Sequence, residues 1–340
     1  MSKALVTCRA VGLGAVGAAT VLALICRRKS IANTVNSFTK KYRTKATVRS
    51  TPYSPMPPPK KLKIALCQIS VTEDKKKNIE TALANIKEAA ASGASLVVLP
   101  EMWNCPYSND SFPSYAEDID GGTSESIAML SSAARDANIV LVGGSIPERS
   151  EGRLYNTSCV FGRDGHLLAK HRKIHLFDID IPGKITFKES LTLSPGESLT
   201  VVDTDIGRLG VGICYDMRFP EMSQLYAAKG CQILVFPGAF NLTTGPAHWE
   251  LLLRARAIDN QVFVAACSPA RSSNANQYQA WGHSTVVDPW ATVRATCDHT
   301  PQIVYADLDL AEIEERRTGL PYRQQKRLDL YALVDLKTLE

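Results

Sequence analysis

Three residues whose side chains could carry out nucleophilic chemistry follow or interrupt apolar runs of the chain. Glu101 comes directly after the run LVVLP, Cys214 comes directly after the run LGVGI, and Lys173 lies in a strand-like stretch at 169–176. Functional groups of α/β proteins gather at the carboxyl ends of strands, so we expect these three side chains to meet there. A cysteine thiol is a weak nucleophile until a neighbouring base or positive charge activates it, and a glutamate and a lysine could supply both.

Each of these residues also has a simpler interpretation. A cysteine after a strand is usually a small buried hydrophobic residue, a lysine in a strand usually lies on a solvated face, and a glutamate after Leu-Pro can be an ordinary loop residue. A carboxylate directly behind apolar strand residues is nevertheless costly unless a cation or a donor pairs with it. The residue types alone therefore leave both interpretations open.

Apolar runs and helical periodicity predict the elements that would position these residues. We expect strands near 63–69, 95–100, 139–142, 154–161, 167–176, 207–214, 232–237, 262–266, 282–288 and 302–308, and helices near 78–91, 125–137, 221–229, 248–260 and 310–317. The alternation of strands and helices, mixed with hairpins and without a second linker, predicts one α/β domain whose sheets are covered by helices.

The charge of the chain is divided unevenly along its length. Residues 1–72 contain thirteen Lys and Arg and no Asp or Glu, whereas the remaining 26 basic and 34 acidic residues give the rest a net charge of −8. No basic cluster stands out in that acidic body, which argues against a nucleic-acid partner. The nine cysteines are scattered and form no C-x-x-C motif, so we expect a reducing compartment and no metal cluster.

Three longer runs carry a resemblance to a known family over nearly the whole chain from residue 62. They are LPEMW at 99–103, HRKIHL at 171–176 and GICYDMRFPE at 212–221. They resemble the three signature blocks of the nitrilase superfamily, the carbon–nitrogen hydrolases, in the family's order of Glu, Lys and Cys. Further runs are similar to the omega-amidase branch, most closely to its plant forms: NCPY at 104–107, FDIDIPG at 177–183, FKES at 187–190, GAFNLTTG at 238–245 and HWE at 248–250.

The resemblance implies a four-layer αββα sandwich, a homodimer, and catalysis without a metal or an organic cofactor. It implies that Cys214 is the nucleophile and that Glu101 takes and returns the proton. Lys173 and the backbone N–H of Tyr215 would stabilise the oxyanion. Glu189 matches the additional active-site glutamate of the family, which positions the substrate or the lysine.

The implied substrates are monoamides of short dicarboxylates, chiefly α-ketoglutaramate and α-ketosuccinamate. Arg218 matches the carboxylate-binding arginine of the family, and a guanidinium can bind a carboxylate through two hydrogen bonds. Tyr107, Phe240 and Thr244 match further pocket positions. An ordinary surface ion pair is the alternative for Arg218.

Two other functions stay open beside the omega-amidase. One is a sister-branch enzyme of the same superfamily that acts on nitriles or N-carbamoyl amines. The other is an inactive nitrilase-like scaffold that binds proteins. The intact set of Glu101, Lys173 and Cys214 argues against the scaffold, because a scaffold has no need of all three.

Residues 1–60 read as a leader and linker that precede a hydrolase domain at 61–340. The apolar run at 11–26 is shorter than the about 20 residues of a membrane-spanning helix, and the segment is basic, rich in hydroxyl residues and free of acids. This composition predicts an organelle transit peptide, with a membrane anchor as the alternative and no membrane contact for the mature domain. The resemblance to plant forms favours the chloroplast, with the mitochondrion second and the cytoplasm if the leader is no transit peptide.

Two motifs are set aside. GLGAVG at 12–17 matches the dinucleotide fingerprint, but no acidic residue follows at about 20 positions to bind a ribose. His171 and His175 could suggest a metal site. In a continuous strand, however, Lys173 would share their face and repel a cation.

Overall fold

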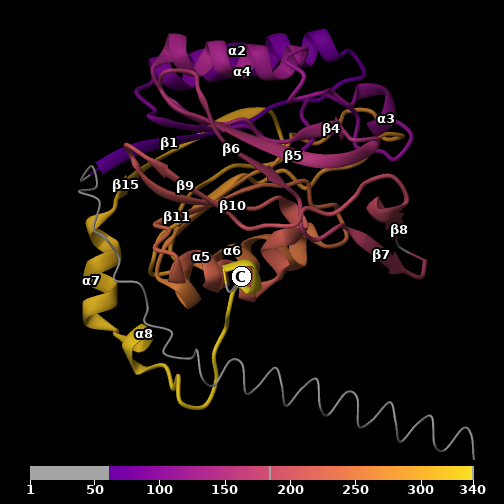
Figure 1. The fold of residues 1–340 in the computed structure, drawn as a ribbon. Coiled ribbons are helices and arrows are strands. Elements are labelled where there is room, and N and C mark those ends of the chain that lie inside the picture. Colours follow the sequence, from indigo (N-terminus) through magenta and orange to yellow (C-terminus); the bar gives the residue numbers. More distant parts are fainter. Residues whose placement is uncertain (1–60, 184, 339–340) are drawn as a thin grey trace, which may run out of the picture. The chain divides into compact units, whose positions relative to one another are not determined.

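The computed structural model describes residues 61–183 and 185–338 as two β-sheets with helices outside each of them (Figure 1). The predictions for the leader at 1–60 lie outside the described residues. In the part that is described, the order of layers is helices, sheet, sheet, helices. The predicted four-layer αββα sandwich is therefore confirmed.

The first sheet has seven strands and provides the ends at which Glu101 and Lys173 lie. Its strands are β1 (Lys61–Gln68), β2 (Leu96–Val98), β3 (Val140–Val142), β4 (Ile146–Ser150), β5 (Arg153–Phe161), β6 (Leu167–Arg172) and β15 (Gln302–Asp309). Strands β1, β2 and β3 are parallel, whereas β15, β4 and β6 pair with their neighbours in antiparallel register. Parallel pairing brings the carboxyl ends of β1, β2 and β3 to one edge of the sheet.

The second sheet has six strands and leads into the turn at Cys214. Its strands in spatial order are β14 (Val293–Thr296), β13 (Thr285–Val287), β12 (Phe263–Cys267), β11 (Ile233–Pro237), β10 (Gly207–Val211) and β9 (Thr200–Thr204). Strands β10, β11 and β12 are parallel. A separate two-stranded hairpin consists of β7 (Asp178–Ile181) and β8 (Ile185–Lys188).

Helices cover the outer face of each sheet. In Figure 1, α2 (Lys75–Ala91) and α4 (Glu125–Ala137) lie over the first sheet, and α5 (Pro220–Ala228) and α6 (Gly245–Asn260) lie over the second. The shorter elements are α3 (Phe112–Tyr115), α7 (Ala311–Gly319), α8 (Tyr322–Gln325) and the 3₁₀ turns η1 (Glu189–Leu191), η2 (Cys214–Arg218) and η3 (Leu336–Thr338). No helix within 61–183 or 185–338 is both long and apolar enough to cross a membrane.

The alternation of side chains along each strand divides the core into layers. In β1, Ile64 and Leu66 point into the core between the two sheets, whereas Ala65 and Cys67 point toward α2 and α4. Strand β11 behaves in the same way against α5 and α6. Strands buried on both faces read as continuous apolar runs, which explains why the pattern predicted them correctly.

The helices and central strands agree with the sequence predictions, but several strand ends do not. The strand expected to run to 176 ends at Arg172, and the strand expected to run to Cys214 ends at Val211. Lys173 and Cys214 therefore lie in the loops that follow β6 and β10. The short strands β4, β7, β8, β9 and β14 were not predicted, and β7, β8 and β14 contain no buried residue.

Candidate active site

Glu101 lies in a tight buried turn after β2. The residue that follows it, Met102, has a positive φ of 51°, and its backbone N–H donates to Oγ of Ser145 at 3.1 Å. Gly144 packs against this turn so closely that a Cβ there would lie 2.2 Å from the carbonyl oxygen of Pro100. The turn therefore needs a glycine beside it, and it holds the carboxylate of Glu101 in a fixed place.

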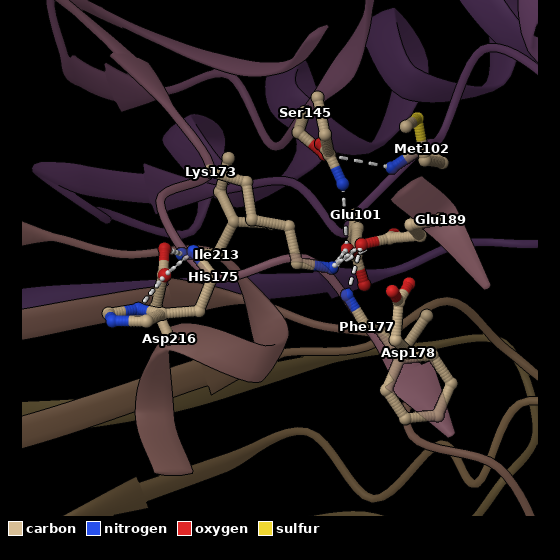
Figure 2. A network of polar contacts seen from close by, with 12 residues as sticks. Glu101, Met102, Ser145, Lys173, His175, Phe177, Asp178, Glu189, Ile213 and Asp216 are labelled. Carbon is tan, nitrogen blue, oxygen red and sulfur yellow. Dashed lines mark hydrogen bonds and ion pairs between the residues drawn. The ribbon is translucent and has the colours of Figure 1, made fainter. Parts of the chain in front are cut away.

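Lys173 joins two carboxylates in the interior of the protein. Its side chain is fully buried, and its Nζ lies 2.8 Å from Oε1 of Glu101 and 3.0 Å from Oε1 of Glu189 (Figure 2). Glu189 also accepts hydrogen bonds from the hydroxyl of Tyr107 and from the backbone N–H of Phe177, both at 2.7 Å. Four of the residues singled out from the sequence thus meet in one cluster: Glu101, Tyr107, Lys173 and Glu189.

The charges of this cluster depend on one another. Burial by itself lowers the pKa of Lys173, but the negative charges of Glu101 and Glu189 outweigh it and hold that pKa well above its usual value. Burial raises the pKa of Glu189, and the positive charge of Lys173 opposes this increase only in part. Lys173 consequently remains a permanent cation at neutral pH, which suits a group that stabilises negative charge.

The two oxygens of Glu101 have different surroundings. Oε1 accepts hydrogen bonds from Lys173 and from Nδ2 of Asn156, each at 2.8 Å. Oε2 is buried and has no hydrogen-bond partner among the described residues. This oxygen is therefore available to accept a proton from a reacting group.

Cys214 begins the 3₁₀ turn η2 and has a positive φ of 47°. Such a conformation is costly for a residue with a side chain, and it is characteristic of sites where the surrounding fold imposes it. Burial raises the pKa of the Cys214 thiol well above its usual value, the charge of Glu101 raises it further, and Lys173 lowers it in part. The resting state is therefore a thiol near a carboxylate that can take its proton.

Asp216 connects the Cys214 turn to the loop that carries Lys173. Its fully buried carboxylate accepts hydrogen bonds from the backbone N–H groups of Ile213 and His175, both at 2.9 Å. It also contacts Nε2 of His171 at 3.1 Å and Nδ1 of His175 at 2.8 Å. Figure 2 shows the contacts of Asp216 with Ile213 and His175 beside the backbone of Lys173, whose amino group points toward Glu101 and Glu189.

The prediction that Lys173 shares one strand face with the two histidines is wrong. Because β6 ends at Arg172, the strand alternation stops before Lys173. His171 and His175 both contact Asp216, while Lys173 points away from them to Glu101. Both histidines thus contact a buried carboxylate. Burial alone would raise the pKa of Asp216, but the hydrogen bonds with His171 and His175 outweigh it and hold that pKa well below its usual range.

Arg218 lies at the end of the Cys214 turn. Its guanidinium carbon is 4.7 Å from the ring centre of Phe240 and 5.5 Å from that of Tyr215, and its Nη1 lies 3.1 Å from Nδ1 of His248. Within 61–183 and 185–338 it forms no ion pair with a carboxylate, so the surface ion pair that was the alternative interpretation is absent there. Burial lowers its pKa from the usual value, yet the guanidinium remains cationic at neutral pH.

The other predicted pocket residues lie around the start of α6 and the Cys214 turn. Thr244 is buried, and its backbone N–H donates to Oδ1 of Asn241 at 2.8 Å. Phe240 packs edge-to-face on Trp249 with ring centres 5.1 Å apart. The ring of Tyr215 lies 5.3 Å from that of Phe177, between Arg218 and the Glu189 loop.

Three residues that contact this site were not predicted from the sequence. Asn156 lies in β5 directly before two other polar residues, Thr157 and Ser158, so no local contrast marks it, and its contact with Glu101 joins residues 55 positions apart. Tyr278 stacks on Tyr107 with ring centres 4.6 Å apart and donates to the carbonyl oxygen of Ala239 at 2.6 Å, and no local pattern marks it. Asp216 stands inside the signature block but its role depends on contacts with a distant loop.

A small pocket of about 40 Å³ opens beside Glu101. Tyr107 and Tyr278 form one wall, and Ala270 and Gln277 line it together with Glu101. A cavity of this size holds one or two water molecules. The pocket thus offers space for water beside the carboxylate of Glu101.

The family model for carbon–nitrogen hydrolases matches residues 63–318, which is most of the described chain. The chain belongs to the carbon–nitrogen hydrolase family. It is therefore a hydrolase that acts on carbon–nitrogen bonds, and the resemblance stated from the three signature blocks is confirmed.

The curated relatives of this carbon–nitrogen hydrolase include omega-amidases. The chloroplastic omega-amidase of Arabidopsis thaliana is 62% identical over 84% of this chain and 78% of its own length. The omega-amidase NIT2 of Homo sapiens is 58% identical over 81% of this chain and 98% of its own length. Among solved structures, Nit3 of Saccharomyces cerevisiae, a member of branch 10 of the nitrilase superfamily, superposes with a TM-score of 0.73 at 46% identity, covering 79% of this chain and 97% of that chain.

Proposed function

We propose that this chain is an omega-amidase that hydrolyses the terminal amide of α-keto dicarboxylate monoamides such as α-ketoglutaramate and α-ketosuccinamate. The observation that carries the proposal is the arrangement of Arg218, a half-buried cation without an acidic partner among the described residues, on the same short turn as Cys214. This turn can hold a carboxylate at one end while the nucleophile at the other end reaches an amide. The identity to curated omega-amidases over most of the chain supports the same substrate class.

The first half of the proposed reaction forms a thioester. Oε2 of Glu101 takes the proton of Cys214, and the thiolate attacks the carbonyl carbon of the amide. Lys173 and the backbone N–H of Tyr215 stabilise the oxyanion that develops on the carbonyl oxygen. Collapse of the tetrahedral intermediate breaks the C–N bond, and Glu101 gives its proton to the departing ammonia.

The second half hydrolyses the thioester with water as the only co-reactant. Glu101 removes a proton from water, the hydroxide adds to the thioester carbon, and the same oxyanion donors stabilise the new intermediate. The C–S bond breaks, Cys214 regains its proton from Glu101, and the dicarboxylate leaves. In this scheme Glu189 and Tyr107 act on Lys173 and Glu101 by holding them at their observed distances.

Substrate recognition is assigned to the region around Arg218. Two of its guanidinium N–H groups bind the carboxylate of the monoamide side by side. Phe240, Tyr215 and Thr244 form the walls of this part of the pocket in the proposal.

The test is ammonia release by the purified full-length chain with α-ketoglutaramate, succinamate, glutamine and a simple nitrile as substrates. Cys214→Ala serves as the control for the nucleophile. We expect turnover of the keto-acid amide that falls at least about 10³-fold in the variant, because the covalent route is lost. Turnover of the nitrile or of an N-carbamoyl amine instead would favour the sister-branch alternative, and no turnover by folded, reduced protein would favour an inactive scaffold.

We further propose residues 1–60 as a chloroplast transit peptide and linker before a hydrolase domain at 61–340, and a homodimer as the working assembly. The acid-free composition of the leader and the chloroplastic omega-amidase of Arabidopsis thaliana support the first proposal. The mitochondrion is the second possibility for this leader. The substrate is a small molecule in each case.

A further inference from the structure

Helix α6 holds Arg218 at both its backbone and its head group. The carbonyl oxygen of Arg218 accepts a hydrogen bond from Nη2 of Arg256 at 3.2 Å, and that of Met217 accepts one from Nε of Arg256 at 2.8 Å. The guanidinium of Arg218 contacts His248, with Nη1 3.1 Å from Nδ1. Arg256 and His248 both belong to α6, so one helix contacts both the backbone and the guanidinium of Arg218.

The contact defines the tautomer in which His248 can accept a hydrogen bond from Arg218. A guanidinium has only donors, so Nδ1 of His248 must accept, and the neutral ring carries its proton on Nε2. A protonated ring would lose this acceptor and would bring two positive charges to within 3.1 Å of each other. In this geometry His248 serves Arg218 as a hydrogen-bond acceptor.

A neutral acceptor has a different consequence from a carboxylate at this position. An Asp or Glu would orient Arg218 but would also neutralise it, and an incoming carboxylate would have to displace that partner. The imidazole uses one donor of the guanidinium and leaves its charge and its other donors available. The rings of Phe240 and Tyr215 lie 4.7 Å and 5.5 Å from the guanidinium carbon and restrict its movement without neutralising it.

We propose that His248 is a positioning residue that makes this hydrolase prefer amides that carry a carboxylate. It acts through Arg218 by holding the guanidinium in one orientation as an uncompensated cation. The proposal rests on the proposed function, in which Arg218 binds the carboxylate of the substrate. It assigns the selectivity to a pair of residues on two different elements, η2 and α6.

The test compares a charged and an uncharged substrate in the full-length chain. His248→Leu removes the acceptor at similar volume, and His248→Asn keeps an acceptor oxygen near the position of Nδ1. We expect His248→Leu to raise KM for α-ketoglutaramate about tenfold, equivalent to about 1.4 kcal/mol, with kcat within about twofold. Hydrolysis of butyramide, which has no carboxylate, should not change, and His248→Asn should restore KM to within about threefold of wild type.

A double-mutant cycle separates this role from a general effect on folding. In the Arg218→Met background, His248→Leu should have no further effect on KM for α-ketoglutaramate, because the group through which it acts is gone. Equal losses on α-ketoglutaramate and butyramide, an unchanged KM, or additive effects in the cycle would each overturn the proposal.

A binding measurement keeps the proposal testable if the proposed function fails. Failure of the wild-type chain to hydrolyse α-ketoglutaramate would contradict the proposed function alone. Titration calorimetry with α-ketoglutarate, itself a dicarboxylate, then reads the same Arg218 site without turnover. Affinity about tenfold weaker in His248→Leu than in wild type would support the role of His248, and equal affinities would refute it.

Discussion

In the proposed mechanism Cys214 depends on Glu101 to remove its proton. The thiol pKa is raised, first by burial and then by the charge of Glu101, so the thiolate is scarce at neutral pH and the reaction depends on transfer of the proton to the carboxylate. A free thiol in water would instead become reactive as the pH rises through about 8.5. The two situations predict different pH profiles.

For Glu101→Gln we expect kcat/KM to fall by about 10²- to 10⁴-fold at pH 7, because the base is removed. The residual activity should then rise with pH from 7 to 9, since only thiolate formed by the solvent reacts and burial still raises the pKa of the thiol. The wild-type profile should be nearly flat over the same interval. Steady-state ammonia release across this pH range checks both profiles, and a wild-type rate that rises as steeply as the variant's would contradict proton transfer from Cys214 to Glu101.

At the scale of elements, Asp216 determines how the loops after β6 and β10 meet. Both loops carry a reactive residue, Lys173 and Cys214, and neither loop contains the whole site. The carboxylate of Asp216 accepts from backbone N–H groups on each loop, so the two reactive residues are aligned by a third that need not touch the substrate. A rigid connection of this kind is the arrangement expected of a preorganised site.

Asp216→Asn should therefore reduce both stability and kcat. We expect a loss of about 3 kcal/mol in the free energy of unfolding at pH 7, because an amide cannot accept from all four donors and leaves polar groups unpaired. The pKa of Asp216 is depressed in the folded state, so its contribution is fully present above the unfolded pKa of about 4 and is lost as the pH falls further. Urea unfolding at pH 7 and at pH 3 should show the difference between variant and wild type shrinking at the lower pH.

Asp288→Asn is the matched control for this prediction. Asp288 is also a buried carboxylate, and it accepts from the backbone N–H groups of Trp290 and Thr292 and from Arg294, in the turn between β13 and β14. Asp288→Asn should lower the free energy of unfolding by a similar amount and leave kcat within about twofold of wild type. Equal effects of the two variants on kcat would mean that Asp216 is no more than a structural anion.

At the scale of the whole molecule, large apolar side chains remain exposed near the end of the chain. Leu328 and Leu330 are 67% and 69% exposed, and Leu251 on α6 is 65% exposed. Asp335 in the same terminal segment pairs with Lys229 at 2.9 Å, so the segment passes the end of α5. Exposed apolar groups on neighbouring elements are typical of a surface that a partner covers.

We expect the full-length chain to have twice the mass of a single 37.1 kDa chain in solution. Replacing Leu328 and Leu330 together by Ser should shift the population toward monomer, because a dimer interface depends on such apolar burial. Leu167→Ser, at a side chain that is 43% exposed on β6, is the control and should leave the mass unchanged. Light scattering after size-exclusion chromatography distinguishes the outcomes, and a monomeric wild type would refute the homodimer.

The leader can be tested separately from the enzyme. A fluorescent protein fused behind residues 1–60 should be imported into chloroplasts of plant cells and shortened there, because the segment is basic, rich in hydroxyl residues and free of acids. Replacing Arg27 and Arg28 by Glu should leave the fusion outside, since transit peptides contain few acids. Imaging with organelle markers decides between chloroplast and mitochondrion, and a diffuse signal would contradict both.

Much of this protein could be predicted from local patterns in the sequence. Apolar runs buried on both faces, such as β1 and β11, and helices with strong periodicity, such as α4, were predicted to within a few residues. The signature blocks around Glu101, Lys173 and Cys214 indicated the family and its chemistry, because the types and order of these residues are a property of the chain itself.

The tertiary structure alone decided how these groups act together. Strand ends such as Arg172 and Val211 depend on where the pairing with a neighbouring strand stops. The hydrophobic periodicity of one strand does not indicate where that neighbour lies. The contact of His248 with Arg218 joins residues 30 positions apart, and that of Lys173 with Glu101 joins residues 72 positions apart. Pairing and charge balance at such separations arise only when the sheets stack, so the sequence determined which groups were present and the fold decided which of them meet.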